Sequence, residues 1–222
     1  MKIDLLYILM VASAAIAVVP VLVLLWYRKT LFQQSFGVAL LGVYSSHFIA
    51  GVFEHISCYL FNTTYPVYHF YVISLGFFYY MLFAKKLTIS VLKKLAVFLL
   101  VLMLATEVYE FFFRGGLFNN NNLAYLSLQV YTILFYFLYL VDTFKNAPHS
   151  LIYSRGEFGI YSAIFVFAII QFLFALIEND ISESLGLNSR INMIWGSYVW
   201  AYIIYLIISS YLIWKNMRLS PN

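Results

Sequence analysis

Long apolar runs alternate with short polar connectors along the whole chain. Seven such runs are visible, at residues 5–27, 36–60, 67–84, 95–113, 123–144, 159–178 and 191–214. Each is close to the ~20 residues that an α-helix needs to cross the hydrocarbon core of a bilayer. The pattern predicts an all-α, polytopic membrane protein in which residues 1–222 form a single seven-helix transmembrane bundle. Pro20 predicts a kink in the first helix.

The composition indicates the same class of protein. Hydrophobic residues make up 64% of the chain and charged residues only 10%, whereas soluble domains contain ~25% charged residues. A soluble fold with this composition would have too few polar side chains to cover its surface. The single cysteine, Cys58, excludes an intrachain disulfide and a zinc site built from several cysteines. We interpret Cys58 as a small buried apolar residue.

The positions of the basic residues predict the orientation of the bundle. Of the 13 Lys and Arg residues, only Lys2, Arg114 and Arg190 lie before the first run or in the even-numbered connectors. An excess of Lys and Arg is typical of the cytoplasmic loops of membrane proteins. We therefore predict a cytoplasmic C-terminus and an outside N-terminus, in the inner (plasma) membrane of a bacterium. Because these loops carry the net charge of +4, that charge does not indicate a nucleic-acid partner.

The second run carries a stripe of polar and small side chains. His47, Gly51, Glu54, His55 and Cys58 fall within about 100° of one helix face at 100° per residue. Polar groups are costly in hydrocarbon, and they frequently mark functional sites in membrane helices. Because a helix rises ~1.5 Å per residue, His47 is expected near the middle of the membrane, with Glu54 and His55 in the outer third.

Other runs carry polar side chains at a comparable depth. The predicted lining of one outward-facing polar cavity is His47, Glu54, His55, His69, Glu107, Gln129 and Gln171. Each of these side chains also has a structural interpretation, in which it bonds to a group on a neighbouring helix. Glu110 and Arg114 are four residues apart and are expected to pair. We interpret the Tyr and Trp residues, such as Tyr68 and Trp26, as an interfacial belt.

Three functions are open for such a cavity. The chain contains no sequence pattern of a nucleophilic hydrolase and no His-Glu-x-x-His motif. A binding protein is therefore favoured over an enzyme. A transporter or channel for a cation or small polar solute is the second hypothesis. The third is a metal-dependent membrane enzyme that uses His55 with Glu54 or Cys58, and a carboxylate or His69 from another helix. The identity of a cofactor is left open.

The layout of the chain also resembles that of a known group of proteins. The basic loop from Lys85 to Lys94 contributes to the likeness, as do Asn192-Met193-Ile194-Trp195 and Tyr211-Leu212-Ile213-Trp214-Lys215 at the two ends of the last run. These features are similar to those of small, largely uncharacterised seven-helix proteins of the bacterial inner membrane, which resemble the membrane sensor halves of some histidine kinases. The resemblance implies a non-enzymatic sensor or accessory subunit. Its outer cavity would recognise a small ligand or a protein partner, and it would signal through a separate partner in the membrane or cytoplasm.

Overall fold

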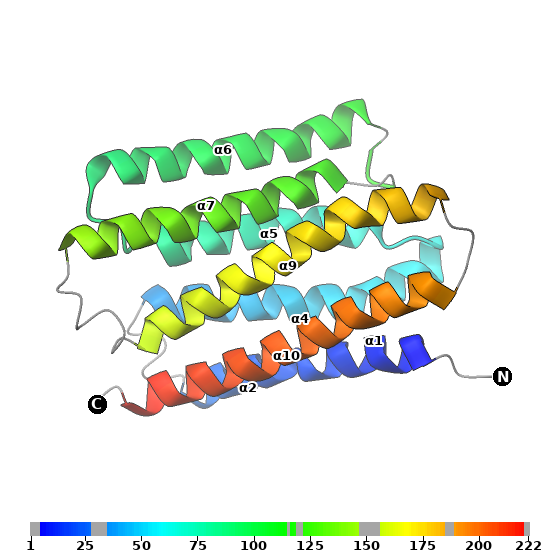
Figure 1. The fold of residues 1–222 in the computed structure, drawn as a ribbon, viewed down its shortest axis with the longest axis horizontal. Coiled ribbons are helices and arrows are strands. Elements are labelled where there is room, and N and C mark those ends of the chain that lie inside the picture. The colour runs from blue at the N-terminus through cyan, green and yellow to red at the C-terminus, as the bar shows by residue number, and fades with distance from the viewer. Residues whose placement is uncertain are drawn as a thin grey trace.

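The computed structural model describes residues 5–27, 35–114, 116–118, 122–146, 156–184 and 189–219. The elements in chain order are α1 (Leu5–Ile16), α2 (Val18–Trp26), α4 (Ser35–Phe61), α5 (Tyr65–Ala84), α6 (Ser90–Phe113), α7 (Asn122–Asn146), α9 (Gly156–Ser184) and α10 (Ser189–Leu219). The helices run side by side as one bundle (Figure 1). The predicted all-α class is confirmed for the described residues.

Seven segments of the described chain are long and apolar enough to cross a membrane. They coincide with the seven predicted runs, and the helix ends differ by a few residues; α6, for example, begins at Ser90 instead of residue 95. The first span consists of α1 and α2, which are separated at Ala17. Pro20 explains this break, because its ring conflicts with the carbonyl of Ile16 four residues earlier and it has no N–H to bond there.

The charged residues divide the bundle into two ends. α1 begins at one end and α10 finishes at the other (Figure 1). We call the end where α10 finishes the basic end, because Lys85, Lys86, Lys93, Lys94, Lys145, Lys215 and Arg218 lie in or beside its connectors. We call the opposite end, which is nearer to Glu54, Glu107 and Glu110, the acidic end. Lys2, Arg28, Lys29 and Arg155, which also entered the orientation prediction, lie outside the described residues.

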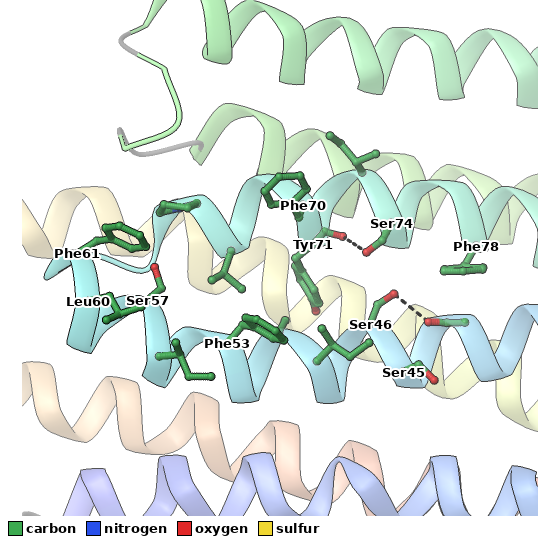
Figure 2. A pocket seen from close by; sticks show the side chains of 17 residues that line it. Ser45, Ser46, Phe53, Ser57, Leu60, Phe61, Phe70, Tyr71, Ser74 and Phe78 are labelled. Carbon is green, nitrogen blue, oxygen red and sulfur yellow. Dashed lines mark hydrogen bonds between the residues drawn. The ribbon is translucent and has the colours of Figure 1, made fainter.

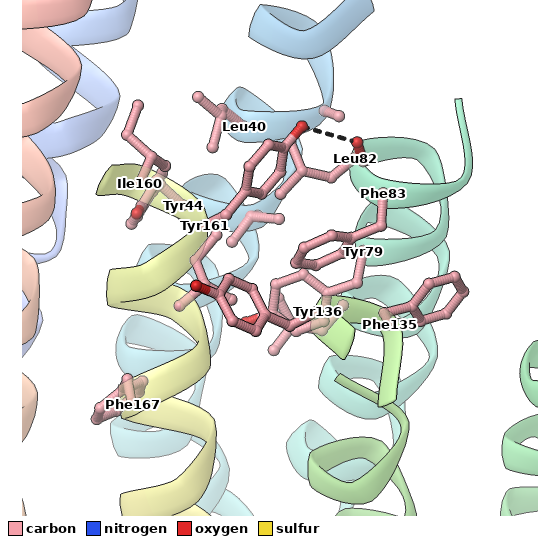
Figure 3. Packing of buried hydrophobic residues seen from close by; sticks show 14 of the residues in the cluster. Leu40, Tyr44, Tyr79, Leu82, Phe83, Phe135, Tyr136, Ile160, Tyr161 and Phe167 are labelled. Atoms are coloured by element: carbon pink, nitrogen blue, oxygen red, sulfur yellow. Dashed lines mark hydrogen bonds between the residues drawn. The ribbon is translucent and has the colours of Figure 1, made fainter. Parts of the chain in front are cut away.

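Aromatic side chains fill the half of the bundle towards the basic end. The ring of Phe83 lies 4.9 Å from that of Tyr161 and 5.8 Å from that of Phe135, measured between centroids. Tyr139 packs on the same group, with its ring centroid 4.5 Å from that of Tyr161. The hydroxyl of Tyr161 donates a hydrogen bond to the carbonyl of Leu82 at 3.1 Å, which satisfies it in apolar surroundings (Figure 3). We call Phe83, Phe135, Tyr139 and Tyr161 the aromatic core.

Candidate functional site

A cavity of about 100 Å³ lies in the half of the bundle towards the acidic end. Side chains from α1, α4, α5, α7, α9 and α10 line it, so spans from both halves of the sequence meet there. Its lining includes Ser13, His47, Gly51, Glu54, His55, Tyr68, Tyr71, Tyr125, Gln171, Trp195, Tyr198 and Tyr202. We call it the polar cavity, because most of these side chains carry a hydrogen-bonding group.

Hydrogen bonds connect the walls of the polar cavity. The hydroxyl of Tyr68 donates to Oε1 of Glu54 at 3.0 Å and thereby joins α5 to α4. Gln171 on α9 donates from Nε2 to the hydroxyls of Tyr125 at 2.8 Å and Tyr198 at 3.1 Å. The two hydrogen bonds from Gln171 link α9 to α7 and α10. The geometry of the cavity is therefore set by polar contacts between helices, which are well suited to hold a bundle together in lipid.

His47 lies at the inner end of the polar cavity. Its side chain is 2% exposed, and its Nδ1 bonds to the hydroxyl of Tyr71 at 2.9 Å. Its Nε2 has no hydrogen-bond partner among the described side chains. The rings of Tyr44, Tyr71, Phe167, Tyr202 and Tyr205 surround it, with centroids 5.5 to 6.4 Å away. His47 therefore presents a polar group to the cavity on one side and meets tightly packed rings on the other.

Three of the seven predicted site residues do not line the polar cavity. His69 on α5 and Glu107 on α6 are both buried, and they bond to each other through Nδ1 and Oε1. Gln129 on α7 is also buried, and its Nε2 has no hydrogen-bond partner in the described part of the chain. The four residues that the structure brings together are His47, Glu54, His55 and Gln171.

Carboxylates of α6 have a different role, which is to attach this helix to the bundle. α6 lies at the edge of the molecule and packs chiefly against α5 and α7 (Figure 1). Apolar helices in lipid have no hydrophobic driving force between them, so polar contacts contribute to their association. Glu107 joins α6 to α5 through His69. Glu110 accepts hydrogen bonds from the backbone N–H groups of Leu123 and Ala124 at 3.0 and 3.2 Å, at the start of α7.

The other end of the α6–α7 pair has a reciprocal arrangement. Asp142, near the end of α7, accepts hydrogen bonds from the backbone N–H groups of Thr88 at 3.0 Å and Ile89 at 2.8 Å, where α6 begins. The hydroxyl of Thr88 donates to the same carboxylate at 3.1 Å. The first N–H groups of a helix have no partner within that helix. Glu110 caps α7 because Leu123 and Ala124 lie in its first turn. Asp142 instead binds the two residues that directly precede α6, and it thereby fixes the entry into this helix.

The ion pair predicted between Glu110 and Arg114 is present. Their charged atoms lie 3.6 Å apart, and the side chain of Glu110 is almost completely buried whereas that of Arg114 is exposed. Cys58 is exposed, so its interpretation as a buried apolar residue is wrong.

The tyrosines of the polar cavity are functional candidates that the sequence pattern alone did not identify. Tyr68 was expected in the interfacial belt, but its hydroxyl bonds to Glu54 between two helices. Trp26, by contrast, is 84% exposed, as a belt residue would be. Tyr198 and Tyr202 are four residues apart on α10, so they lie on one helix face. This spacing is the feature of the sequence from which their shared location could have been predicted.

An apolar groove of about 820 Å³ lies between α4 and α5 (Figure 2). Phe53, Leu60, Phe70 and other apolar side chains line it. Tyr71 lines both this groove and the polar cavity. Its hydroxyl bonds to His47 on the cavity side. Ala50 also lines both, so the groove and the polar cavity share part of their walls. The sequence pattern did not predict this groove.

The ligand set expected for a metal-dependent enzyme does not come together. Among the described residues, no group of three or more His, Cys, Asp and Glu side chains is arranged to hold a metal ion. His69, one of the expected ligands from another helix, bonds instead to Glu107 and does not line the polar cavity.

The chain was compared with known proteins at three levels. Neither a family model nor a curated protein nor a solved structure matches it.

Proposed function

We propose that this protein is a non-enzymatic membrane sensor or accessory subunit that binds a small polar ligand in the polar cavity. The observation that carries the proposal is the convergence of hydrogen-bonding side chains from six helices on one small cavity. A ligand held there contacts several helices at once, so it favours whichever arrangement of the bundle binds it best. α10 extends from the cavity to the basic end, and it is a direct mechanical connection between the ligand and a partner at that end.

The packing below the cavity supports binding over transport. Next to His47, the rings of Phe167 and Tyr205 stack with centroids 4.2 Å apart. The aromatic core follows, and Phe83 lies 12 residues beyond Tyr71 on α5, a distance of about 18 Å along the helix. A transporter needs a site that opens to both sides of the membrane. A cavity that ends at closely packed rings is better suited to recognition of a ligand from one side.

The proposal places the polar cavity in the outer half of a bacterial inner membrane and the basic end in the cytoplasm. The clustering of described Lys and Arg residues at the basic end supports this orientation. A separate protein partner in the membrane or cytoplasm would receive the signal there. The resemblance to sensor halves of histidine kinases is consistent with this division between a receiving membrane bundle and a separate output protein.

Labelling of single cysteines tests the orientation. In a Cys58→Ser background, one variant carries Thr64→Cys between α4 and α5, and a second carries Lys85→Cys directly after α5. We expect a membrane-impermeant maleimide to label Thr64→Cys in intact cells and Lys85→Cys only after permeabilisation, because the Lys-rich connectors are predicted to be cytoplasmic. The reverse pattern would show that the bundle is inserted the other way round.

Thermal unfolding of the detergent-solubilised protein tests the binding function. The probes are small amines, carboxylates, amino acids and sugars, each added to wild type. We expect at least one of these classes to raise the unfolding temperature, because a ligand at 100 times its Kd that binds only the folded state stabilises it by about 2.7 kcal/mol. The shift should disappear in Gly51→Leu. Gly51 lines the polar cavity and a Cβ there would lie 3.3 Å from Cβ of Ala14 on α1, so the larger side chain changes the cavity wall where α4 meets α1.

Gly196→Leu is the matched control for that experiment. A Cβ at residue 196 meets no atom within 4 Å, and Gly196 does not line the polar cavity. We expect this variant to keep the full probe-induced shift. The proposed function fails if no probe stabilises wild type, or if Gly51→Leu responds as strongly as wild type does.

A further inference from the structure

We infer that the polar cavity binds a small organic cation, an ammonium group that carries a few methyl or methylene groups. The inference rests on the proposed function and specifies the chemical class of its ligand. Three properties of the cavity carry it: the charge of the lining, the arrangement of the aromatic rings and the volume.

The charge of the lining favours a cation. Among the described residues that line the polar cavity, Glu54 is the only carboxylate, and neither a lysine nor an arginine is present. The cavity is recessed between helices, so a charge inside it is screened less by water than a charge at the surface. A positively charged ligand is attracted to Glu54 under these conditions. A carboxylate or phosphate ligand would be repelled by it and would find no Lys or Arg to pair with in this lining.

The lining of the cavity is rich in aromatic rings, which come from α5, α7 and α10. The ring of Tyr68 is tilted 82° from that of Tyr71 and 75° from that of Tyr125, with centroids 6.4 and 6.3 Å apart. On α10, the rings of Trp195 and Tyr198 are 89° apart in orientation, with centroids at 6.2 Å. These pairs pack edge to face, so neighbouring rings of the lining have different orientations. A cation within about 6 Å of such ring centroids is attracted by the negative face of each ring, as in the aromatic cages that bind quaternary ammonium groups.

The volume limits the size of the ligand. Ligand pockets usually have volumes of about 300–1,000 Å³, and the polar cavity, at about 100 Å³, is smaller. A methylated ammonium group suits so small a cavity better than a sugar or a peptide does.

Tetramethylammonium chloride is the probe that tests this inference, with tert-butyl alcohol as the neutral probe of similar shape and potassium chloride as the control for ionic strength. The measurements are the unfolding temperature and the Trp fluorescence, to which Trp195 in the cavity contributes. We expect tetramethylammonium to raise the unfolding temperature of wild type and to change its fluorescence in a saturable way. The two controls should do neither at equal concentration.

Variants of the lining separate charge from aromatic contact. Glu54→Gln keeps the size of the side chain and removes its charge. Tyr68→Leu removes one aromatic ring from the lining. We expect each change to weaken tetramethylammonium binding by about tenfold. Tyr68→Phe keeps the ring and should retain binding within a few fold. Using two independent variants keeps the test valid if one of them does not fold.

The possible results separate this inference from the function on which it rests. Saturable binding of tetramethylammonium that is lost in Glu54→Gln or Tyr68→Leu supports it. If tetramethylammonium binds wild type and both variants equally, the cation inference is wrong. If only neutral or anionic probes stabilise wild type, and Gly51→Leu abolishes their effect, the cation inference is also wrong but the proposed function stands. If none of these probes stabilises wild type, both proposals fail.

Discussion

Phe83→Ala is expected to lower the free energy of unfolding by about 3–5 kcal/mol, the usual cost of truncating a fully buried phenylalanine. Phe83 is 0% exposed, and its ring contacts Tyr161 and Phe135 at centroid distances of 4.9 and 5.8 Å. The truncation leaves a cavity between α5, α7 and α9 that stiff aromatic neighbours cannot collapse to fill. The loss is measured by unfolding the purified protein with increasing mole fractions of SDS in mixed micelles.

Phe137→Ala is the matched control for this prediction. Phe137 is on α7 and is 50% exposed, so its truncation removes little packing and should cost below about 1 kcal/mol. Phe83→Ala should retain any ligand-induced shift found for wild type, because about 18 Å of helix separates Phe83 from the cavity residue Tyr71. Equal stability of the two variants would contradict the structure of the aromatic core.

Asp142→Ala is expected to destabilise the bundle by about 2–3 kcal/mol, because hydrogen bonds to a charged acceptor contribute more than neutral ones. The carboxylate accepts bonds from the backbone of Thr88 and Ile89. Without it, the N–H groups of the two residues that directly precede α6 lose their acceptor, at the place where this edge helix joins α7. The change is measured by the same SDS titration.

Two variants define the contribution of Asp142. Asp142→Asn keeps one carbonyl oxygen as an acceptor and should lose less stability than Asp142→Ala. Glu157→Ala removes a carboxylate at the same end of the bundle, one that bonds to Lys86 at 2.9 Å with both side chains partly exposed. Exposed ion pairs contribute about 0–1 kcal/mol, so this variant should be close to wild type. If Glu157→Ala is the more damaging of the two alanine changes, the role of Asp142 in fixing the entry into α6 is wrong.

The histidine and the carboxylates of the predicted site now have distinct explanations. Glu107 is accounted for by its bond to His69, which attaches α6 to α5. Glu54 bonds to Tyr68 and lines the polar cavity. His47 is the hardest of these residues to explain by structure alone, because it is buried with one ring nitrogen that lacks a partner among the described side chains. Buried polar groups of this kind are costly in a membrane and are often functional.

The sequence alone allowed the fold class and the seven spans to be predicted. Run length and composition are local properties, and in a bilayer every span must satisfy its own backbone hydrogen bonds, so a long apolar run has essentially one stable structure. The break in the first span could also be predicted from Pro20, because the missing N–H is a property of that residue. The ends of helices were less certain. α6 starts five residues earlier than predicted and includes Lys93 and Lys94, which hydropathy had excluded from the run. Directly before it, Ile89 bonds to Asp142, which is 53 residues away and could not be paired with it from the sequence.

The candidate site could be predicted only in part. Helical periodicity placed Glu54 and His55 on the same face as His47, and all three line the polar cavity. It could not show that Glu107 would meet His69, because a periodic pattern defines the face of a helix and not the neighbour against which that face packs. The sequence pattern also assigned Tyr68 to the interfacial belt. A tyrosine near the end of a span has the same sequence context whether it lies in a belt or in a cavity wall.

The sequence by itself therefore determined that this chain is a bundle of seven apolar helices. It also identified the side chains that are too polar to face lipid without a hydrogen-bonding partner. Only the tertiary structure decided which of those side chains share a cavity and which ones hold α6 in place. The physical reason is that the bilayer selects helices by their own length and hydrophobicity. Packing between helices depends instead on contacts among residues far apart in the chain, such as Gln171 with Tyr125.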